Sequence, residues 1–180
     1  MISISAEPVN IEQVARGIAH IPGAIERAAK NAIRRTMRGA RKDAGTLAKK
    51  RYTLPAGIVT KSLSVKVSGF SGEMTSKGFR NPLEKAKTNP KGRIKQRGKY
   101  IRAVVVRGQG GIIKRAFRKS GGTSIFERVG ASRFPIRKLK TVSAPSMVSH
   151  PTVSIPVINK MESRLGINFL HEASAILGGF

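Results

Sequence analysis

Cysteine and tryptophan are absent from this chain of 180 residues, and aromatic side chains make up only 5% of it. Without cysteine, disulfide bonds and thiolate metal sites are excluded. With so few aromatic side chains, the chain is poorly supplied for the base stacking that single-strand nucleic-acid-binding proteins use. If nucleic acid is the partner, we therefore expect contacts with phosphate backbones, without sequence preference.

Long apolar runs are also absent. No stretch approaches the roughly 20 apolar residues of a membrane span. The first seven residues, MISISAE, lack the basic and apolar regions of a signal peptide. We expect a soluble protein made in a cytoplasm, with no membrane partner.

Acidic side chains are scarce, which bears on catalysis. Aspartate and glutamate together number 9. A nuclease would be the natural enzyme for so basic a chain, yet it usually needs two or more acids to hold Mg²⁺. The histidines and the acids of the expected strands and loops are scattered in sequence: His20, His150, His171, Glu73, Glu84 and Glu127. The sequence predicts no catalytic residue, no metal site and no cofactor.

Positive charge is what the chain has in excess. Lysine and arginine number 35, which gives a formal net charge of +26. A globule with that imbalance repels itself, so its working state should include a polyanion or acidic protein neighbours. The apolar fraction of 39% and the charged fraction of 24% are those of a folded chain rather than a basic tail.

Two long amphipathic helices are expected, over residues 22–51 and about 156–177. Apolar and small residues recur in the first at the three- and four-residue steps of one helical face: Ile25, Ala29, Ala32, Ile33, Thr36, Met37, Ala40, Ala44 and Leu47. Basic residues fall on the opposite side: Arg27, Lys30, Arg34, Arg38, Arg41 and Lys42. Gly45 allows a bend or an end of this helix.

The residues between these helices predict strands. Alternating or apolar segments lie at 63–67, 73–79, 100–107, 123–129 and 136–142, and 102–106 is apolar enough to be central in a sheet. The fold class expected is α+β, with the long N-terminal helix and the C-terminal helix packed on a mainly antiparallel β-sheet. We expect a single domain over 1–180, with a long basic loop or extension at 81–99 that has no core-facing element.

Two blocks of sequence resemble a known family. The first begins at 21–28 (IPGAIERA) and continues through 34–36 (RRT), 50–52 (KRY) and 58–63 (IVTKSL). The second comprises 124–128 (SIFER), 134–136 (FPI) and 143–148 (SAPSMV). In this order they resemble the minor tail protein Z family of tailed bacteriophages and prophages. The resemblance covers most of the chain, and 77–99 is its least distinctive part.

The resemblance implies a structural virion protein without catalytic function. Such a tail completion protein acts late in assembly, at the head-proximal end of a long non-contractile tail, in head–tail joining and DNA positioning. It implies tail terminator and head–tail connector proteins as partners, a homo-oligomeric ring, and packaged DNA contacted through its backbone. The expected location is the virion, after assembly in the host cytoplasm.

Under this interpretation one set of basic residues is expected to face the polyanion: Arg34, Arg38, Arg41, Lys91, Arg93, Lys95 and Arg97. Two alternatives remain open. One is a cellular, sequence-independent nucleic-acid-binding protein associated with ribosomes or the nucleoid. The other is a nuclease, whose turnover would depend on a metal and on Glu73, Glu84 or Glu127.

Overall fold

A computed structural model describes residues 11–92 and 100–178. The chain divides into two compact units. Unit 1 comprises Met1–Ala44, Leu63–Ser76 and Pro151–Phe180, and unit 2 comprises Gly45–Ser62 and Lys77–His150. The boundary at 44/45 falls inside one continuous helix, so the division does not decide whether the chain is a single domain. We describe each unit by itself.

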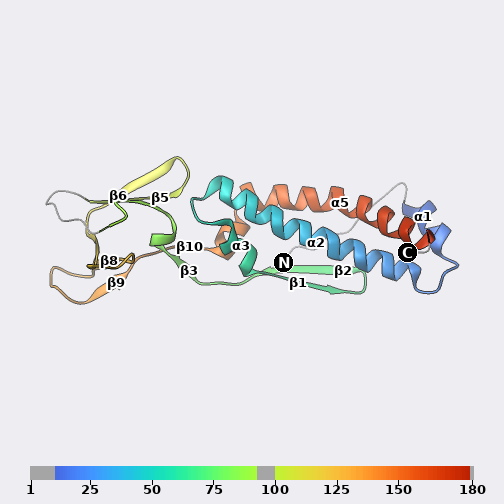
Figure 1. The fold of residues 1–180 in the computed structure, drawn as a ribbon, viewed down its shortest axis with the longest axis horizontal. Helices are drawn as coiled ribbons and strands as arrows, with labels where there is room; N and C mark the ends of the chain where they lie inside the picture. Colours follow the sequence, from blue (N-terminus) through green and yellow to red (C-terminus); the bar gives the residue numbers. More distant parts are fainter. Residues whose placement is uncertain (1–10, 93–99, 179–180) are drawn as a thin grey trace. The chain divides into compact units, whose positions relative to one another are not determined.

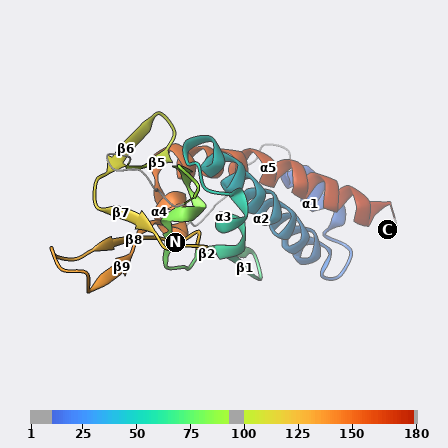
Figure 2. The same cartoon turned by 60° about the vertical axis from the view of Figure 1, so that its left-hand side comes forward.

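Unit 1 is built from helices and one hairpin (Figure 1). Its elements are α1 (Ile11–Ile18), the first part of α2 (Ala24–Arg51), β1 (Leu63–Ser68), β2 (Ser71–Ser76) and α5 (Pro151–Leu177). β1 and β2 pair antiparallel in register from Leu63↔Ser76 to Ser68↔Ser71. In both views α2 and α5 run side by side, and α1 lies against α5 (Figures 1 and 2).

Small side chains form the core of unit 1. Every fourth residue of α2 within this unit is buried: Ala24, Ala28, Ala32, Thr36, Ala40 and Ala44. On α5 the buried residues are Val153, Val157, Met161, Phe169 and Ala173. Because alanine adds little beyond the backbone, neighbouring elements can approach α2 closely. On the side of α2 that carries larger residues, the small residue belongs to β2: a Cβ at Gly72 would lie 2.6 Å from the side chains of Ile33 and Met37.

Both long helices are confirmed, with shifted starts. α2 begins at Ala24, after Gly23, whose φ of 67° favours glycine. α5 begins at Pro151 rather than near Pro156, which lies inside the helix. Pro151 is as well suited as Pro156 to a first helical turn, so the sequence signal for the start was ambiguous.

Unit 2 consists of short strands and helices (Figure 2). Its elements, besides the end of α2, are α3 (Ala56–Ser62), β3 (Arg80–Pro82), η1 (Leu83–Lys85), β4 (Lys87–Asn89), β5 (Ile101–Val106), β6 (Gln109–Ile113), β7 (Ala116–Arg118), β8 (Ile125–Arg128), β9 (Ile136–Lys138), β10 (Lys140–Ser143) and α4 (Ala144–Ser149). The strands form the sheets β4-β5-β6, β7-β8-β9 and β10-β3, all antiparallel.

The core of unit 2 lies between its sheets. Leu83, Ile101, Ala103 and Ile125 are buried together. β5 is central in its sheet, as its apolar sequence predicts. The α+β class with antiparallel strands is confirmed, but over the described residues the strands form four small sheets instead of one.

The prediction that no core-facing element lies at 81–99 is wrong for the first part of that segment. Leu83 and Ala86 are buried. Asn81 and Thr88 are buried through polar contacts, because Asn81 Nδ2 donates to the Val142 carbonyl at 2.8 Å and Thr88 Oγ1 accepts from a buried arginine. Hydrogen bonds satisfy these buried polar groups, so a segment with little apolar character still forms β3, η1 and β4.

The later part of the predicted basic loop, residues 93–99, lies outside the described residues.

α2 does not end at Gly45. The helix continues to Arg51, and Gly45 is buried where α3 approaches. A Cβ at this position would lie 2.6 Å from Thr60 Cγ2 and 3.7 Å from the Ala56 Cβ. The glycine therefore permits close packing of α3 on α2 instead of breaking the helix.

Candidate polyanion-binding surfaces

The basic residues of α2 form a narrow stripe. We call Arg27, Lys30, Arg34, Arg38 and Arg41 the basic ridge. At about 100° per residue they fall within an arc of roughly 80°, and at about 1.5 Å per residue the ridge is ~21 Å long. Lys30 is half-buried and the other four are exposed. One face of the helix is thus basic along about half of its length, starting in its first turn.

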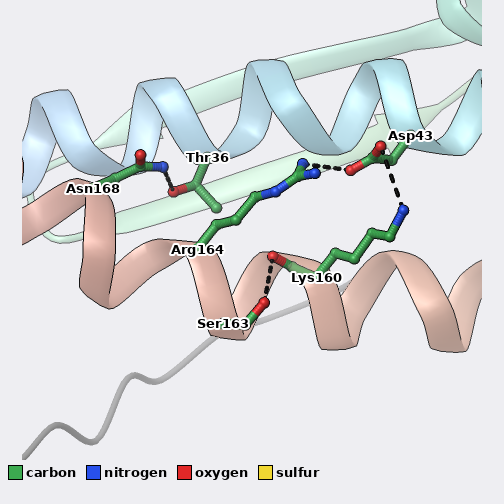
Figure 3. A network of polar contacts seen from close by, with 6 residues as sticks. All are labelled: Thr36, Asp43, Lys160, Ser163, Arg164 and Asn168. Carbon is green, nitrogen blue, oxygen red and sulfur yellow. Dashed lines mark hydrogen bonds and ion pairs between the residues drawn. The ribbon is translucent and has the colours of Figure 1, made fainter.

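Asp43 of α2 and Glu172 of α5 form ion pairs between the two helices, with cations that lie outside the ridge. Asp43 accepts from Arg164 Nη1 at 2.5 Å and lies 3.8 Å from Lys160 Nζ (Figure 3). Glu172 of α5 lies 3.4 Å from Arg35, which is outside the ridge. Among the described acids, none is within ion-pair distance of Arg34 or Arg38.

A polar contact inside the interface also holds the two helices. Asn168 Nδ2 donates to Thr36 Oγ1 at 2.8 Å, and Figure 3 shows this pair beside the Asp43 cluster. Thr36 is the one polar residue in the buried alanine row of α2. A hydrogen bond between two specific positions fixes how α5 meets α2, and so fixes which face of α2 is left for the ridge.

A second basic surface lies on the β4-β5-β6 sheet of unit 2. A cleft there, which we call the sheet-face cleft, is lined by Lys87, Thr88, Asn89, Lys91, Arg102, Val104, Gly108 and Gly110. Lys87 pairs with Val104, and Asn89 pairs with Arg102. Of these lining residues, all from the described part of the chain, three are cations and none is an acid.

Strand alternation positions the cations of this cleft. Ile101 and Ala103 of β5 are buried in the core, so the alternating residues Arg102 and Val104 are on the other face of the sheet. Gly110 of β6 pairs with Val104, and a Cβ there would meet Val104 Cγ2 at 2.7 Å. The cleft thus has long basic side chains beside a floor with little side-chain bulk.

Buried polar groups support the same sheet from beneath. Arg118 is buried, and its Nη2 donates to Thr88 Oγ1 at 2.8 Å. Its Nη1 donates to the Thr123 carbonyl. Burial lowers the pKa of Arg118, and the charge of Glu84 offsets part of that effect. These contacts fix Thr88 in β4 between the cleft residues Lys87 and Asn89.

Glu84 joins three parts of unit 2. Its Oε1 lies 2.7 Å from Lys138 Nζ and accepts from Ser124 Oγ at 3.1 Å. Burial raises the pKa of this carboxyl, but the hydrogen bonds from Lys138, the backbone and Ser124 outweigh it, so the pKa of Glu84 is below its ordinary value.

The predicted polyanion-facing residues divide between the two surfaces. Arg34, Arg38 and Arg41 are exposed on the ridge of unit 1, and Lys91 is exposed in the cleft of unit 2. Three others, Arg93, Lys95 and Arg97, lie outside the described residues.

Two cleft residues, Lys87 and Arg102, were absent from the predicted set. The signal for Arg102 was present, since it interrupts an apolar strand at an alternating position. Lys87 was visible only as one charge of a presumed loop. Its place beside Arg102 depends on the pairing of β4 with β5, which the sequence does not reveal.

The acids considered for a nuclease belong to different units or pair with different cations. Glu73 belongs to unit 1, whereas Glu84 and Glu127 belong to unit 2, where they pair with Lys138 and Arg137 respectively. In the part of the chain that the structure describes, no three histidine or acidic side chains are grouped as a metal site. The helices in that part are too short or too polar to cross a bilayer.

Comparisons of the chain with protein-family models, with curated proteins and with solved structures find no match.

Proposed function

We propose that this chain is a structural virion protein, a tail completion protein at the head-proximal end of a long phage tail. In this role it acts late in assembly, in head–tail joining and in positioning the DNA. Its partners are the tail terminator and head–tail connector proteins, and copies of the chain form a ring. It contacts packaged DNA through the phosphate backbone.

The observation that carries the proposal is the basic ridge. Five cations share one face of α2, while Asp43 of α2 and Glu172 of α5 pair with cations outside that face. A solvated helix face usually mixes signs, because like charges that are close together repel. A surface of one sign is suited to a site where acidic material is always present, such as a channel that admits DNA.

The order of sequence blocks gives the proposal its location. The blocks that resemble the tail protein family lie in α2, α3, β8 and α4, elements of both units. The charge alone would suit a ribosome-associated or nucleoid protein equally well. The block order favours the head–tail junction over that alternative.

Deletion of the gene for this chain tests the proposal. Electron microscopy of lysates from the deleted phage is expected to show DNA-filled heads and separate tails, and a plasmid copy of the gene should restore joined particles. Normally joined, infectious particles without the gene would refute the proposal. Cofractionation of the chain with ribosomes or nucleoid from uninfected cells would also count against it.

A further inference from the structure

We propose that the sheet-face cleft of unit 2 is a binding site for the phosphate backbone of duplex DNA. This inference rests on the proposed function, which places the chain beside packaged DNA, and it assigns the DNA contact to particular residues. It concerns Lys87, Lys91 and Arg102, two of which the sequence did not single out.

The spacing of the cations suits a polymer of phosphates. Lys87 is paired with Val104 and Asn89 with Arg102, so Lys87 and Arg102 are diagonal neighbours across two antiparallel strands. Diagonal positions are about 7–8 Å apart, which is far enough for two long side chains to contact different phosphates. The amide of Asn89, which is paired with Arg102 and follows Lys87 on the same face of β4, can donate to a phosphate oxygen.

The charge of the cleft is not neutralised within its unit. No acid lines it. Of the acids in unit 2, Glu84 pairs with Lys138 and Glu127 with Arg137, and neither cation belongs to the cleft. Lys87, Lys91 and Arg102 are all exposed. They can therefore meet a ligand without first breaking an ion pair.

The floor of the cleft admits a bulky backbone. Gly108 and Gly110 lack side chains, and Gly108 has a φ of 79°, which a side chain rarely tolerates. Behind the sheet, Thr88 is held by Arg118, so β4 does not depend on the ligand for its position. The site is thus built before any ligand arrives, which lowers the cost of binding.

The lining favours nucleic acid over an acidic protein. Cores of protein–protein interfaces are depleted in charge and enriched in aromatic residues. Among the eight described residues that line this cleft, three are cations and none is aromatic. Protein–DNA interfaces are more polar and much more positively charged. Without aromatic side chains the cleft cannot stack on bases, so binding through it is independent of sequence.

The test measures binding of the purified full-length chain to a fluorescent duplex of arbitrary sequence across a salt series. Its variant is Lys87→Gln/Arg102→Gln. Two lost phosphate contacts should reduce the slope of log affinity against log salt by about two, and the affinity at ~0.1 M salt by about ten- to a hundred-fold. Both side chains are exposed, so circular dichroism should show an unchanged fold.

A matched control removes the same charge elsewhere in the unit. Lys61 and Lys140 are exposed and do not line the cleft. Lys61→Gln/Lys140→Gln should therefore keep most of the slope. Equal effects of the two double variants, or no binding by the unaltered chain, would overturn the inference. Binding of both variants to polyglutamate is measured as well. If Lys87→Gln/Arg102→Gln lost binding to polyglutamate but still bound the duplex like the unaltered chain, the inference would be overturned in favour of an acidic protein partner.

A second measurement needs no variant. Bound duplex should protect Lys87 from acetylation while Lys61 and Lys140 stay reactive, and equal reactivity with and without DNA would contradict the assignment. The two proposals fail separately. If gene deletion gives separate heads and tails but the cleft variant binds DNA like the unaltered chain, only this inference is refuted. Joined particles after deletion would refute the proposed function whatever the chain binds.

Discussion

A few polar side chains in unit 2 make contacts between different elements and so help to hold its fold together. Glu84 contacts Lys138 of β9 and Ser124, just before β8, while Arg118 of β7 holds Thr88 of β4. Each contact joins segments that are far apart in sequence. Removing one partner of a buried or half-buried polar pair leaves the other without its hydrogen bond or opposite charge. Substitutions at such positions therefore lower the stability of the fold.

Glu84→Gln should lower stability in a pH-dependent way. The folded pKa of Glu84 is below its unfolded value, so the carboxylate stabilises the fold fully above the unfolded pKa of about 4.3. That contribution is lost as the pH falls through the lower, folded pKa. Urea unfolding should show the variant about 1 kcal/mol less stable than the unaltered chain at pH 7, with a smaller difference in acid.

Glu162→Gln is the control for net charge, since Glu162 is exposed on α5. A difference for Glu84→Gln that stays constant or grows toward acid pH would contradict the sign of the pKa shift.

At the scale of elements, close helix packing sets the position of the surfaces. α2 presents small residues to its neighbours, and a glycine occurs at a very close approach, where α3 packs at Gly45. Helix propensity alone gives the opposite expectation, because alanine is better than glycine in a helix interior by about 1 kcal/mol. Packing and propensity therefore make opposite predictions for one substitution.

Gly45→Ala should destabilise the protein. The added Cβ would lie 2.6 Å from Thr60 Cγ2, and overpacking of this kind costs typically 1–3 kcal/mol, more than the gain in propensity. Thermal unfolding should show a lower Tm. Adding Thr60→Ser, which removes the clashing methyl group, should recover much of the loss. Gly57→Ala adds a methyl group in open space and should leave Tm unchanged or slightly higher.

A higher Tm for Gly45→Ala would show that the close approach of α3 and α2 is not a constraint on the fold.

The long elements could be predicted from the sequence, whereas the short ones could not. α2 and α5 bury residues at every fourth position, so their own side chains reveal the helix. β3 and β4 have three residues each, and hydrogen bonds with residues distant in sequence hold them in place. Asn81 of β3 donates to the Val142 carbonyl, and Thr88 of β4 accepts from Arg118. Of the six strand pairings in the described residues, five join consecutive strands and one joins β3 to the distant β10. Local patterns do not show where one sheet ends and the next begins, which is why one sheet was expected where four occur.

The same difference between local and distant signals decided which parts of the candidate site could be predicted. The spacing of Arg34, Arg38 and Arg41 on one helix made the ridge visible. The cleft needed Arg102 of β5 and Lys87 of β4 to be brought together by pairing. No local pattern records that pairing, so the sequence suggested only a set of basic residues around Lys91.

At the scale of the whole molecule, the surplus charge is the property that most constrains function. With 35 basic and 9 acidic residues, ion pairs within the chain can neutralise only a minority of the cations. Positive charge is displayed on the ridge of unit 1 and on the cleft of unit 2. A phage neck, filled with DNA and formed by repeated copies, would supply the missing negative charge.

Charge reversal on the ridge should separate assembly from folding. The variant Arg34→Glu/Arg38→Glu/Arg41→Glu changes only exposed side chains, so we expect a folded monomer by circular dichroism. Head–tail joining in a complementation assay should fall by at least tenfold. The variant with lysine at the same three positions keeps the charge and should join normally. Normal infectivity of the glutamate variant would remove these residues from the functional surface.

The central claim is the location of the chain at the head-proximal end of the tail. A cryo-electron microscopy map of the assembled particle tests it most directly. We expect a ring of copies between the tail terminator and the head–tail connector, with the basic ridge or the sheet-face cleft against DNA density. Absence of the chain from the particle, or a position at the distal tip of the tail, would contradict it.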